Sequence, residues 1–353
     1  MKKKISLIVL AIVALTFLLT SPVPTQAATP TPEKIKWVGQ AHVPNSLPFF
    51  KYFKHAADRI TAASNGRLQL SIYAAGAMVP ATKEFDGVSK GIIDFGLGGF
   101  TFWVDKWPAA ALFASVCGHM TPMQKYLWFA EGGGLELLQK MVKDHNVHFT
   151  PGIGLLNPAE IFLQTSSPIK NLADLKKLKI RAIGDGAAIL ARMGVSIVFM
   201  SGGQVYESAA RKIIDGFELD SYRDLSDGKL YEVIKYAYMS PVRSPHELIP
   251  IFYNKKKFDA LPEDLKIIVE SITQEETFRY YTDTLYGQAA IRAELQKKGL
   301  VIGKLPADIE TAFINEAKNH YSELAAKDAL AKEVLDSLNK TSSILHEVQP
   351  EGQ

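Results

Sequence analysis

The sequence has a single cysteine, Cys117, which excludes a disulfide within the chain. The thiol lies in an apolar segment, ALFASVCGH, and this context is typical of a buried structural cysteine rather than a nucleophile. A His-Glu-x-x-His motif, a phosphate-binding loop ending in Lys-Ser/Thr and a Cys/His metal spacing are absent, and the eight histidines form no cluster. These absences disfavour zinc hydrolases and nucleotide-dependent enzymes.

Long apolar runs are also scarce. One stands at the start, where Ile5 to Leu19 follows a lysine-rich tetrapeptide and precedes the helix-breaking SPVP. Fifteen residues are few for crossing ~30 Å of hydrocarbon, and Thr25-Gln26-Ala27 fits a small-x-small cleavage site. We therefore expect residues 1–28 to be a cleaved export signal, with an uncleaved membrane anchor as the alternative.

An excess of charge of one sign is missing from the chain behind this signal. Without its three lysines the 40 basic residues fall to 37, which equals the 37 acidic residues. Nucleic acids and anionic membrane surfaces both select basic proteins. We therefore expect neither as a partner.

The remaining stretch of about 325 residues is long enough for two domains. Residues 35–42 have the composition of a strand, residues 49–60 have helical apolar spacing, and RLQLSIY alternates as a strand does. This alternation of strand and helix continues to about residue 300. It predicts two α/β lobes with largely parallel sheets.

Two segments of the chain resemble each other. KEFDGVSKGIID (83–94) and QVYESAARKIID (204–215) align without a gap and share Ile-Ile-Asp. Each predicts a helix that leads into a strand, so we expect a helix from Pro80 to Lys90 and a strand over 91–100. Two similar lobes would produce such a repeat, and so would chance similarity between two helix–strand units.

One expected helix is much longer than the others. Apolar residues recur at helical spacing from Pro262 to Lys298, with Gly287 as the only internal glycine. At 1.5 Å per residue this helix would be about 55 Å long, which exceeds one small domain. We expect it to lie across both lobes. The tail from Glu310 to Val348 also has helical spacing.

Charged residues stand at expected strand ends. Arg181 ends the strand KIR before a Gly-Asp-Gly turn, and ligands of open α/β sheets bind outside the carboxyl ends of strands. A guanidinium there would bind a carboxylate through two hydrogen bonds, although Arg181 could also be a solvated member of a basic run. Glu160 follows Pro158 near a predicted lobe crossover, and Glu218 lies in the acidic stretch KIIDGFELDSY.

Aromatic and glycine-rich segments complete the list of candidates. Phe102 and Trp103, in GGFTFWVDKW, follow an expected strand and could form the wall of a small organic ligand or pack in the core. Gly132, Gly133 and Gly134 precede a helical pattern and predict a tight turn at the start of a helix.

These segments together resemble the solute-binding subunit of tripartite ATP-independent periplasmic (TRAP) transporters, the DctP-like family. The resemblance covers nearly all of the chain after the signal and lies in SNGRLQLSIYAAGAMVPATKEFDGVSKGIIDFG, LADLKKLKIRAIGDG and GGQVYESAARKIIDGFE. The triple glycine with the following Leu-Glu-Leu is similar to the branch that binds 2-oxo acids and small hydroxy acids.

The resemblance implies a two-lobed periplasmic binding protein fold (type II-like), an α/β fold with mixed sheets flanked by helices and a long helix across both lobes. Residues 33–156 and 246–285 would form lobe I. Residues 157–245 and 286–350 would form lobe II, with the ligand cleft between the lobes.

The resemblance also implies roles for individual residues. Arg181 would form the salt bridge to the substrate carboxylate. In this branch a metal ion, Na+ or Ca2+, connects protein and ligand, and its ligands here would be Glu160, Glu218, the backbone carbonyl of Leu219 and Glu247. Because Glu160 replaces the glutamine usual in the branch, its added negative charge favours Ca2+.

Several positions depart from that branch. Its Tyr-Tyr pair is Thr101-Phe102 here, and its Glu-Trp is Glu218-Leu219. The missing polar donors predict a ligand that is bulkier or more apolar than pyruvate or lactate. A third acidic metal ligand is expected near residues 243–247. The full set of expected ligand-binding residues is Arg181, Phe102, Trp103, Thr101, Glu160, Glu218, Tyr222 and His246.

The function that the resemblance implies is capture rather than catalysis. The protein would reside in the periplasm, bind a small organic monocarboxylate, and deliver it to the membrane permease of a TRAP transporter, as a monomer or a homodimer. A sensor component for the same acids is one alternative. A secreted hydrolase or lyase that uses Glu160 and Glu218 as an acid/base pair is another.

Overall fold

The structure is a computed structural model that describes residues 34–200, 202–219 and 221–348. The expected export signal, residues 1–28, lies outside these ranges. Within them, none of the helices combines the length and the apolar character needed to cross a membrane.

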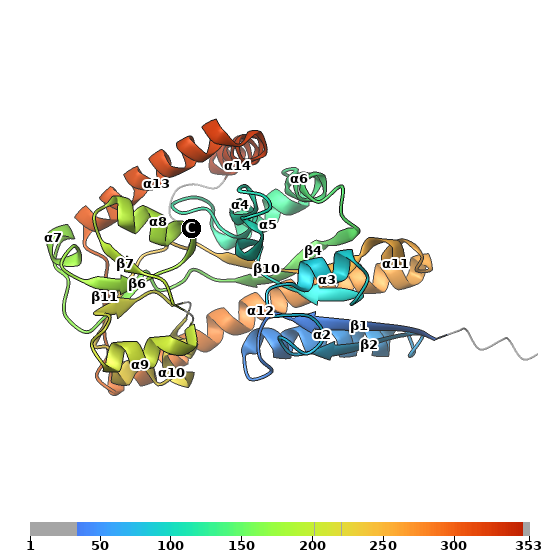
Figure 1. The fold of residues 1–353 in the computed structure, drawn as a ribbon, viewed down its shortest axis with the longest axis horizontal. Coiled ribbons are helices and arrows are strands. Elements are labelled where there is room, and N and C mark those ends of the chain that lie inside the picture. Colours follow the sequence, from blue (N-terminus) through green and yellow to red (C-terminus); the bar gives the residue numbers. More distant parts are fainter. Residues whose placement is uncertain (1–33, 201, 220, 349–353) are drawn as a thin grey trace, which may run out of the picture. The chain divides into compact units, whose positions relative to one another are not determined.

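The first sheet has five strands (Figure 1). In spatial order they are β2 (Leu68–Tyr73), β1 (Ile35–Ala41), β3 (Phe95–Leu97), β10 (Glu247–Asn254) and β4 (Val147–Asn157). β1 is parallel to β2 and β3, whereas β10 is antiparallel to β3 and β4. The late strand β10 therefore lies inside a sheet made mostly of early ones.

The second sheet has six shorter strands. In spatial order they are β11 (Val301–Lys304), β9 (Tyr236–Met239), β5 (Leu163–Thr165), β8 (Gly216–Phe217), β6 (Lys179–Arg181) and β7 (Ser196–Val198). β6 is parallel to β7 and β8, while β5 is antiparallel to β8 and β9. The carboxyl ends of β6, β8 and β9 and the amino end of β5 consequently meet at one edge.

Helices flank both sheets (Figure 1). Those between the strands of the first sheet are α2 (Pro48–Ala63), α3 (Glu84–Ser89), α4 (Ala110–Ala114), α5 (Pro122–Ala130), α6 (Gly134–Met141) and the 3-10 helix η1 (Phe100–Trp103). Those between the strands of the second are α7 (Leu172–Leu175), α8 (Gly184–Arg192), α9 (Val205–Ala210), α10 (Tyr222–Asp227) and the 3-10 helices η2 (Gly202–Gln204) and η3 (Leu230–Glu232). After β10 follow α11 (Lys255–Asp259), α12 (Glu263–Lys297), α13 (Ala307–Lys327) and α14 (Ala329–Val348).

The expected fold class is confirmed, with two sheets flanked by helices. Both sheets are mixed, as the resemblance implied. They are less parallel than the alternation of strand and helix alone predicted, because β10 is antiparallel to β3 and β4, and β5 is antiparallel to β8 and β9.

The lobe boundaries stay a prediction. The indole Nε1 of Trp128 in α5 donates to the Ser337 hydroxyl of α14 at 3.0 Å, so the last helix packs on helices of the first sheet.

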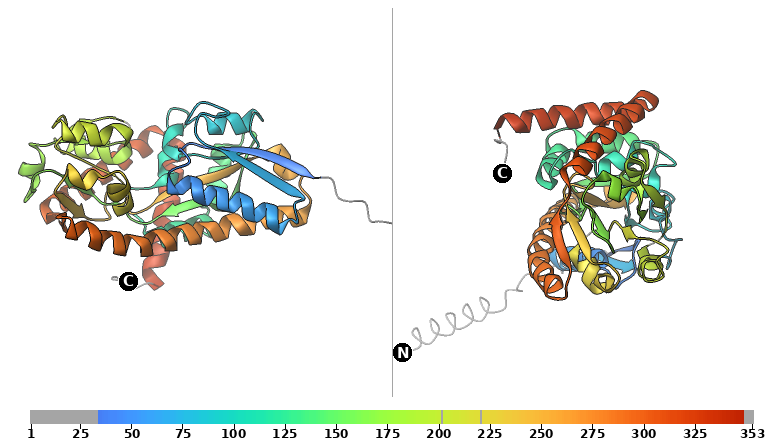
Figure 2. Two further views of the ribbon diagram at one scale, coloured as in Figure 1. Left: turned by 90° about the horizontal axis from the view of Figure 1, so that it is seen from below. Right: turned by 90° about the vertical axis from the view of Figure 1, so that its left-hand side faces the viewer.

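The long helix α12 is present as predicted, with Pro262 at its N-cap. The hydroxyl of Thr277 on α12 donates to the carbonyls of Gly152 and Gly154 in β4. A Cβ on Gly152 would lie 2.5 Å from the backbone of the helix, so the helix rests on bare strand backbone. Further along, Leu295 is fully buried in the core of the second sheet. α12 therefore runs beneath both sheets (Figure 2).

The repeat at 83–94 and 204–215 is also visible in the structure. The N–H of Val38 donates to the carboxylate of Asp94, and the N–H of Asp94 donates back to the Val38 carbonyl, both at 2.7 Å. Lys179 and Asp215 form the same pair of bonds at 2.8 Å. Each aspartate thus ties a helix–strand unit to the neighbouring parallel strand, and Asp215 has a structural role.

Both copies leave their helix through a residue with positive φ, at Gly91 (73°) and Lys212 (56°). This turn shortens the expected elements. The helix predicted from Pro80 begins only at Glu84, and the strand predicted over 91–100 is confined to Phe95–Leu97. The apolar residues that directly follow Gly91 do not form a strand, because the left-handed turn there first directs the chain across the end of the helix.

Residues 87–91 match the Gly-x-Ser-x-Gly pattern of serine hydrolases. That pattern places the serine on a sharp turn from a strand into a helix. Ser89 instead ends helix α3, and its hydroxyl lies 3.5 Å from Nδ1 of His145. The match therefore lacks the geometry of a nucleophile.

Candidate functional site

Four charged side chains gather at the edge of the second sheet where the strand ends meet. Arg181 ends β6, Glu218 follows β8, Arg243 follows β9 by a short loop, and Glu160 lies just before the antiparallel β5. The strand directions bring them together, because three carboxyl ends and one amino end share this edge. We call these four residues the charge cluster.

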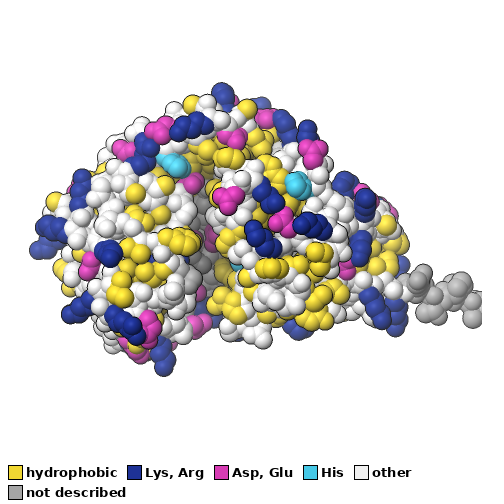
Figure 3. Space-filling view, in the orientation of Figure 1, with side chains coloured by type: hydrophobic (Ala, Val, Ile, Leu, Met, Phe, Trp, Pro, Cys, Tyr) yellow, Lys and Arg dark blue, Asp and Glu magenta, His cyan; other side chains and the backbone are white. Residues whose placement is uncertain are grey.

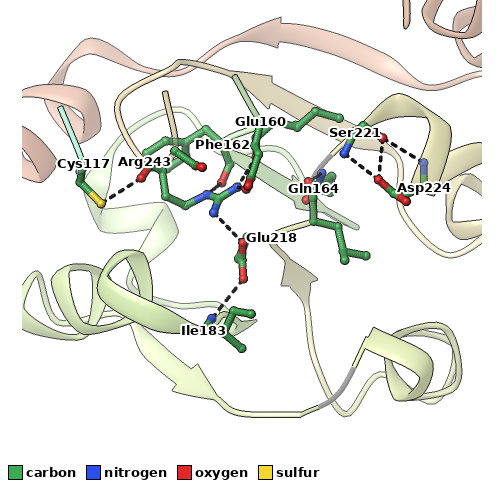
Figure 4. Close-up of polar contacts among 12 residues, drawn as sticks. Cys117, Glu160, Phe162, Gln164, Ile183, Glu218, Ser221, Asp224 and Arg243 are labelled. Carbon is green, nitrogen blue, oxygen red and sulfur yellow. Dashed lines mark hydrogen bonds and ion pairs between the residues drawn. The ribbon is translucent and has the colours of Figure 1, made fainter. Parts of the chain in front are cut away.

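Arg181 and Glu218 form the first ion pair of the cluster. Nη1 of Arg181 donates to the Glu218 backbone carbonyl at 2.9 Å and to its carboxylate Oε1 at 3.1 Å. Oε1 also accepts the backbone N–H of Ile183 at 3.1 Å (Figure 4). Nε of Arg181 donates to the Met200 carbonyl, so backbone just after β7 and β8 fixes the guanidinium plane.

Arg243 joins the two acidic residues of the cluster (Figure 4). Its Nη1 donates to Glu218 Oε2 and its Nη2 to Glu160 Oε2, both at 2.6 Å. The backbone carbonyls of Ile161 and Phe162 accept from Nη2 and Nε at 2.9 and 3.0 Å. Every nitrogen of this guanidinium therefore has an acceptor within the protein.

The aliphatic stem and the backbone carbonyl of Arg243 are also in close contact with the protein. A Cβ on Gly186, in the first turn of α8, would lie 2.9 Å from Cγ of Arg243, so only glycine leaves room for the aliphatic stem. On the other side, the thiol of Cys117 donates to the Arg243 carbonyl at 2.9 Å. The arginine is held from both its main chain and its side chain.

Burial makes this pairing necessary. The side chains of the four cluster residues are at most 6% exposed, and an isolated buried charge is costly. Burial raises the pKa of Glu160; attraction to Arg243 opposes this shift, and repulsion from Glu218 adds to it. Burial alone would lower the pKa of Arg243, but the two carboxylates outweigh burial and raise it. The arginine therefore stays charged.

One donor of the cluster is left over. Nη2 of Arg181 has no acceptor among the residues that the structure describes, whereas its Nε and Nη1 are both bonded. With two arginines and two glutamates the cluster has no net charge before a ligand enters. An incoming carboxylate would find an unused charged donor and no excess of negative charge.

Residues 39–328 match the family described as bacterial extracellular solute-binding protein, family 7. This range holds the whole charge cluster and most of both sheets. The chain belongs to this family.

A curated relative of this family 7 protein is the monocarboxylate 2-oxoacid-binding periplasmic protein of Nostoc sp. The two are 29% identical over 306 residues, which cover 86% of this chain and 82% of the relative. Both chains thus correspond over most of their length.

Three solved structures of TRAP solute-binding proteins have the same two-lobed fold. The protein from Colwellia psychrerythraea, with calcium and pyruvate, has a TM-score of 0.83 at 24% identity and covers 89% of this chain and 96% of its own. The one from Pseudoalteromonas atlantica, with sodium and pyruvate, has 0.81 at 23% with the same coverage. The mixed-occupancy dimer from Bordetella bronchiseptica, with calcium and picolinate, has 0.82 at 20%, covering 89% and 94%. Homologues therefore do hold Ca2+ or Na+ beside a carboxylate, as expected.

The two residues of the expected aromatic wall, Phe102 and Trp103, differ in their exposure to solvent. Phe102 is 42% exposed and packs edge-on against the His42 ring, 5.5 Å between centroids. Trp103 is only 2% exposed and packs among aromatic rings, including Phe85 at 4.7 Å. Trp103 therefore belongs to the core and we leave it out of the proposed site. Thr101, beside Phe102 in η1, is half-buried.

Two other expected ligand-binding residues, Tyr222 and His246, contact other parts of the protein. Tyr222 is buried and its hydroxyl contacts the sulfur of Met239 at 2.8 Å. The ring of His246 is buried, with Nδ1 3.0 Å from the Met120 carbonyl. Burial, strengthened by repulsion from Lys125, lowers the pKa of His246 well below its ordinary value, so the ring is neutral. His246 and Tyr222 are structural in this arrangement.

The expected metal ligands Leu219 and Glu247 also lie near the cluster. The Leu219 carbonyl accepts a hydrogen bond from the Gln164 side chain at 3.0 Å. Burial raises the pKa of Glu247 to about 8, and repulsion from Glu160 and Glu218 acts in the same direction. Glu247 is therefore mostly protonated at neutral pH.

Arg243 is the residue of the site that the sequence did not reveal. It stands in the short range where a third acidic ligand was expected, and nothing in the segment SPVRSPHE distinguishes it from a solvated arginine. Its position one loop after a strand was the available signal. This position indicates a contact with Glu160 only when β9 is known to pair with β5.

Cys117 is buried and free, as predicted, and should not react in the folded protein. Burial raises the pKa of this thiol to about 12, so the reactive thiolate is scarce at pH 8. We expect Ellman's reagent to label the native protein roughly a thousandfold more slowly than the protein in denaturant. Rapid, complete labelling under native conditions would show that the loop carrying Arg243 opens readily.

Proposed function

We propose that this family 7 protein is an extracytoplasmic receptor for a small organic monocarboxylate, with Arg181 as the anchor of the carboxylate. The observation that carries the proposal is the unused Nη2 of Arg181 at the carboxyl end of β6. Ligands of open α/β sheets bind at such edges, and arginine pairs with carboxylates through parallel hydrogen bonds. The 2-oxoacid-binding relative from Nostoc and the pyruvate-bound structures support the same ligand class.

The body of the acid is proposed to be more apolar than pyruvate. Ile183 and Phe199 follow the parallel neighbours β6 and β7 at their carboxyl ends, and both are exposed, Phe199 by 82%. On the first sheet, Phe102 is exposed and Thr101 replaces a phenol expected in the branch. Figure 3 shows a furrow on this face between the elements of the two sheets. Exposed apolar side chains such as Ile183, Phe199 and Phe102 favour an aliphatic or aromatic acid.

The receptor is proposed to act in the periplasm after removal of residues 1–28 and to hand its ligand to a TRAP permease. Closure of lobe I (33–156 and 246–285) on lobe II (157–245 and 286–350) would follow from contacts that the ligand makes only in the closed state. Membership of the solute-binding family supports transport rather than chemistry as the task.

A panel of acids tests this proposal. The mature protein is titrated calorimetrically with 2-oxo, 2-hydroxy, aromatic and dicarboxylic acids, and with the matching amides as neutral controls. We expect a monocarboxylate with an apolar body to bind at least about tenfold more tightly than pyruvate, and its amide not to bind. Preference for a dicarboxylate, or equal binding of acid and amide, would overturn it.

A further inference from the structure

The two carboxylates expected to hold a metal ion are held by an arginine instead. Arg243 donates one 2.6 Å hydrogen bond to Glu218 and another to Glu160. In the sodium- and calcium-bound relatives a cation accompanies the carboxylate ligand. Here the guanidinium supplies a positive charge between Glu160 and Glu218 (Figure 4).

The remaining expected ligands do not complete an ion site. The Leu219 carbonyl is bonded to Gln164. Across residues 34–200, 202–219 and 221–348, no three His, Cys, Asp or Glu side chains are grouped so as to hold a metal. Ca2+ takes six to eight oxygen ligands, and a cation placed here would be repelled by Arg243 and would have to displace its hydrogen bonds. The residues present therefore do not fit the ion.

The arginine is a fitted part of the fold rather than a surface side chain turned inward. All three of its nitrogens donate to protein acceptors, two of them backbone carbonyls at the start of β5. Gly186 leaves the space for its stem, and Cys117 holds its carbonyl. Displacing it would leave the carbonyls of Ile161 and Phe162 without these partners, Glu160 without its cation, and Glu218 with Arg181 alone.

We propose that this protein binds its carboxylate without a metal ion, because Arg243 permanently takes the place of the ion. Arg243 is a positioning residue: it fixes Glu218, and Glu218 in turn orients the guanidinium of Arg181 toward the ligand. The inference rests on the proposed function for the identity of the ligand, but the statement about the ion can be tested alone.

The direct test titrates Ca2+ and Na+ into the chelator-treated protein without any acid. The buffer cation is N-methylglucamine, and heat of binding and thermal stability are recorded. We expect no saturable heat and no stabilisation up to about 1 mM Ca2+, the weak end of protein calcium sites. A saturable Ca2+ or Na+ site in the wild-type protein would overturn the inference, whichever ligand the protein transports.

The second test measures acid binding with and without ions. For the tightest acid of the panel, we expect EDTA treatment and exchange of sodium for N-methylglucamine to change the affinity by less than about twofold. An affinity that falls tenfold or more and returns with Ca2+ or Na+ would sink the inference while leaving carboxylate binding intact. If no acid binds under any condition, the proposed function fails, and the direct ion titration still decides the question of the metal.

Substitution of Arg243 tests the inference in the opposite direction, because removing the arginine should create a Ca2+ site. Arg243→Met frees Glu160 and leaves Glu218 paired with Arg181 alone, so this variant should gain thermal stabilisation by Ca2+ that the wild type lacks, with an affinity at least tenfold higher. Arg243→Lys keeps one positive charge and should gain none. Arg211→Met, at an exposed arginine that pairs with Glu207 one helical turn away, is the matched control. Equal Ca2+ responses in wild type, Arg243→Lys and Arg243→Met would contradict the proposal.

Discussion

Arg181→Ala is expected to weaken carboxylate binding by roughly 30- to 700-fold, a loss of about 2 to 4 kcal/mol. The side chain is buried, its Nη2 has no acceptor among the described residues, and charge-assisted hydrogen bonds are stronger than those between neutral groups. Isothermal titration with the best acid of the panel measures the effect directly.

The control for this substitution must separate binding from folding. Without Arg181, the carboxylate of Glu218 retains Arg243 and the N–H of Ile183, so the fold keeps a partner for the buried charge. Arg211→Ala, on the exposed end of α9, removes a guanidinium of the same size and should leave affinity unchanged. Undiminished binding by folded Arg181→Ala would show that another residue anchors the carboxylate.

Arg243→Met is expected to lower the free energy of unfolding by about 3 to 5 kcal/mol, because it removes one partner of a buried ion network. Glu160 loses its main cation, and Glu218 keeps only Arg181. Urea unfolding at pH 7.5, followed by circular dichroism, measures the loss. The exposed control Arg211→Met should stay within about 0.5 kcal/mol of the wild type.

The deficit of Arg243→Met should also depend on pH. Burial already raises the pKa of Glu160, and removal of the attraction to Arg243 raises it further. A carboxyl group whose pKa is raised on folding favours the folded state while protonated, and this contribution is lost as the pH rises through its folded-state pKa. The variant should therefore be closer to wild type at pH 5 than at pH 8. A deficit that is constant across this range would show that packing, not charge, is what Arg243 supplies.

Much of the site followed from rules about strand ends. Arg181 is expected beside a ligand edge because it stands at the end of a short strand, whereas the role of Glu218 is expected from the family resemblance. The structure places Nη1 of Arg181 3.1 Å from Oε1 of Glu218. The role of Arg243 could not be predicted from the sequence, because its contacts with Glu160 and Glu218 depend on the order of the strands in the sheet. The antiparallel β5 separates β8 from β9 and carries Glu160 to the same edge, and such a ladder order is decided by contacts distant in sequence.

The aromatic pair shows a different limit. Phe102 and Trp103 are adjacent, equally apolar and part of one 3-10 helix, yet one ring is exposed and the other is in the core. Which of them faces inward depends on the phase of that short helix against Phe85 and Phe252. A single turn has too few residues for its apolar spacing to define a face, whereas the 35-residue α12 could be predicted almost to its ends.

The contact between Gly186 and the stem of Arg243 has a consequence for how this protein could have arisen. Any side chain at position 186 would collide with the arginine, whereas a glycine there is harmless when position 243 carries a smaller residue. In a lineage that began with an ion in the site, glycine would therefore have to come first and the arginine second. If Arg243 replaces the ion as proposed, glycine at 186 together with arginine at 243 is the sequence pattern expected of a relative that binds its acid without a metal.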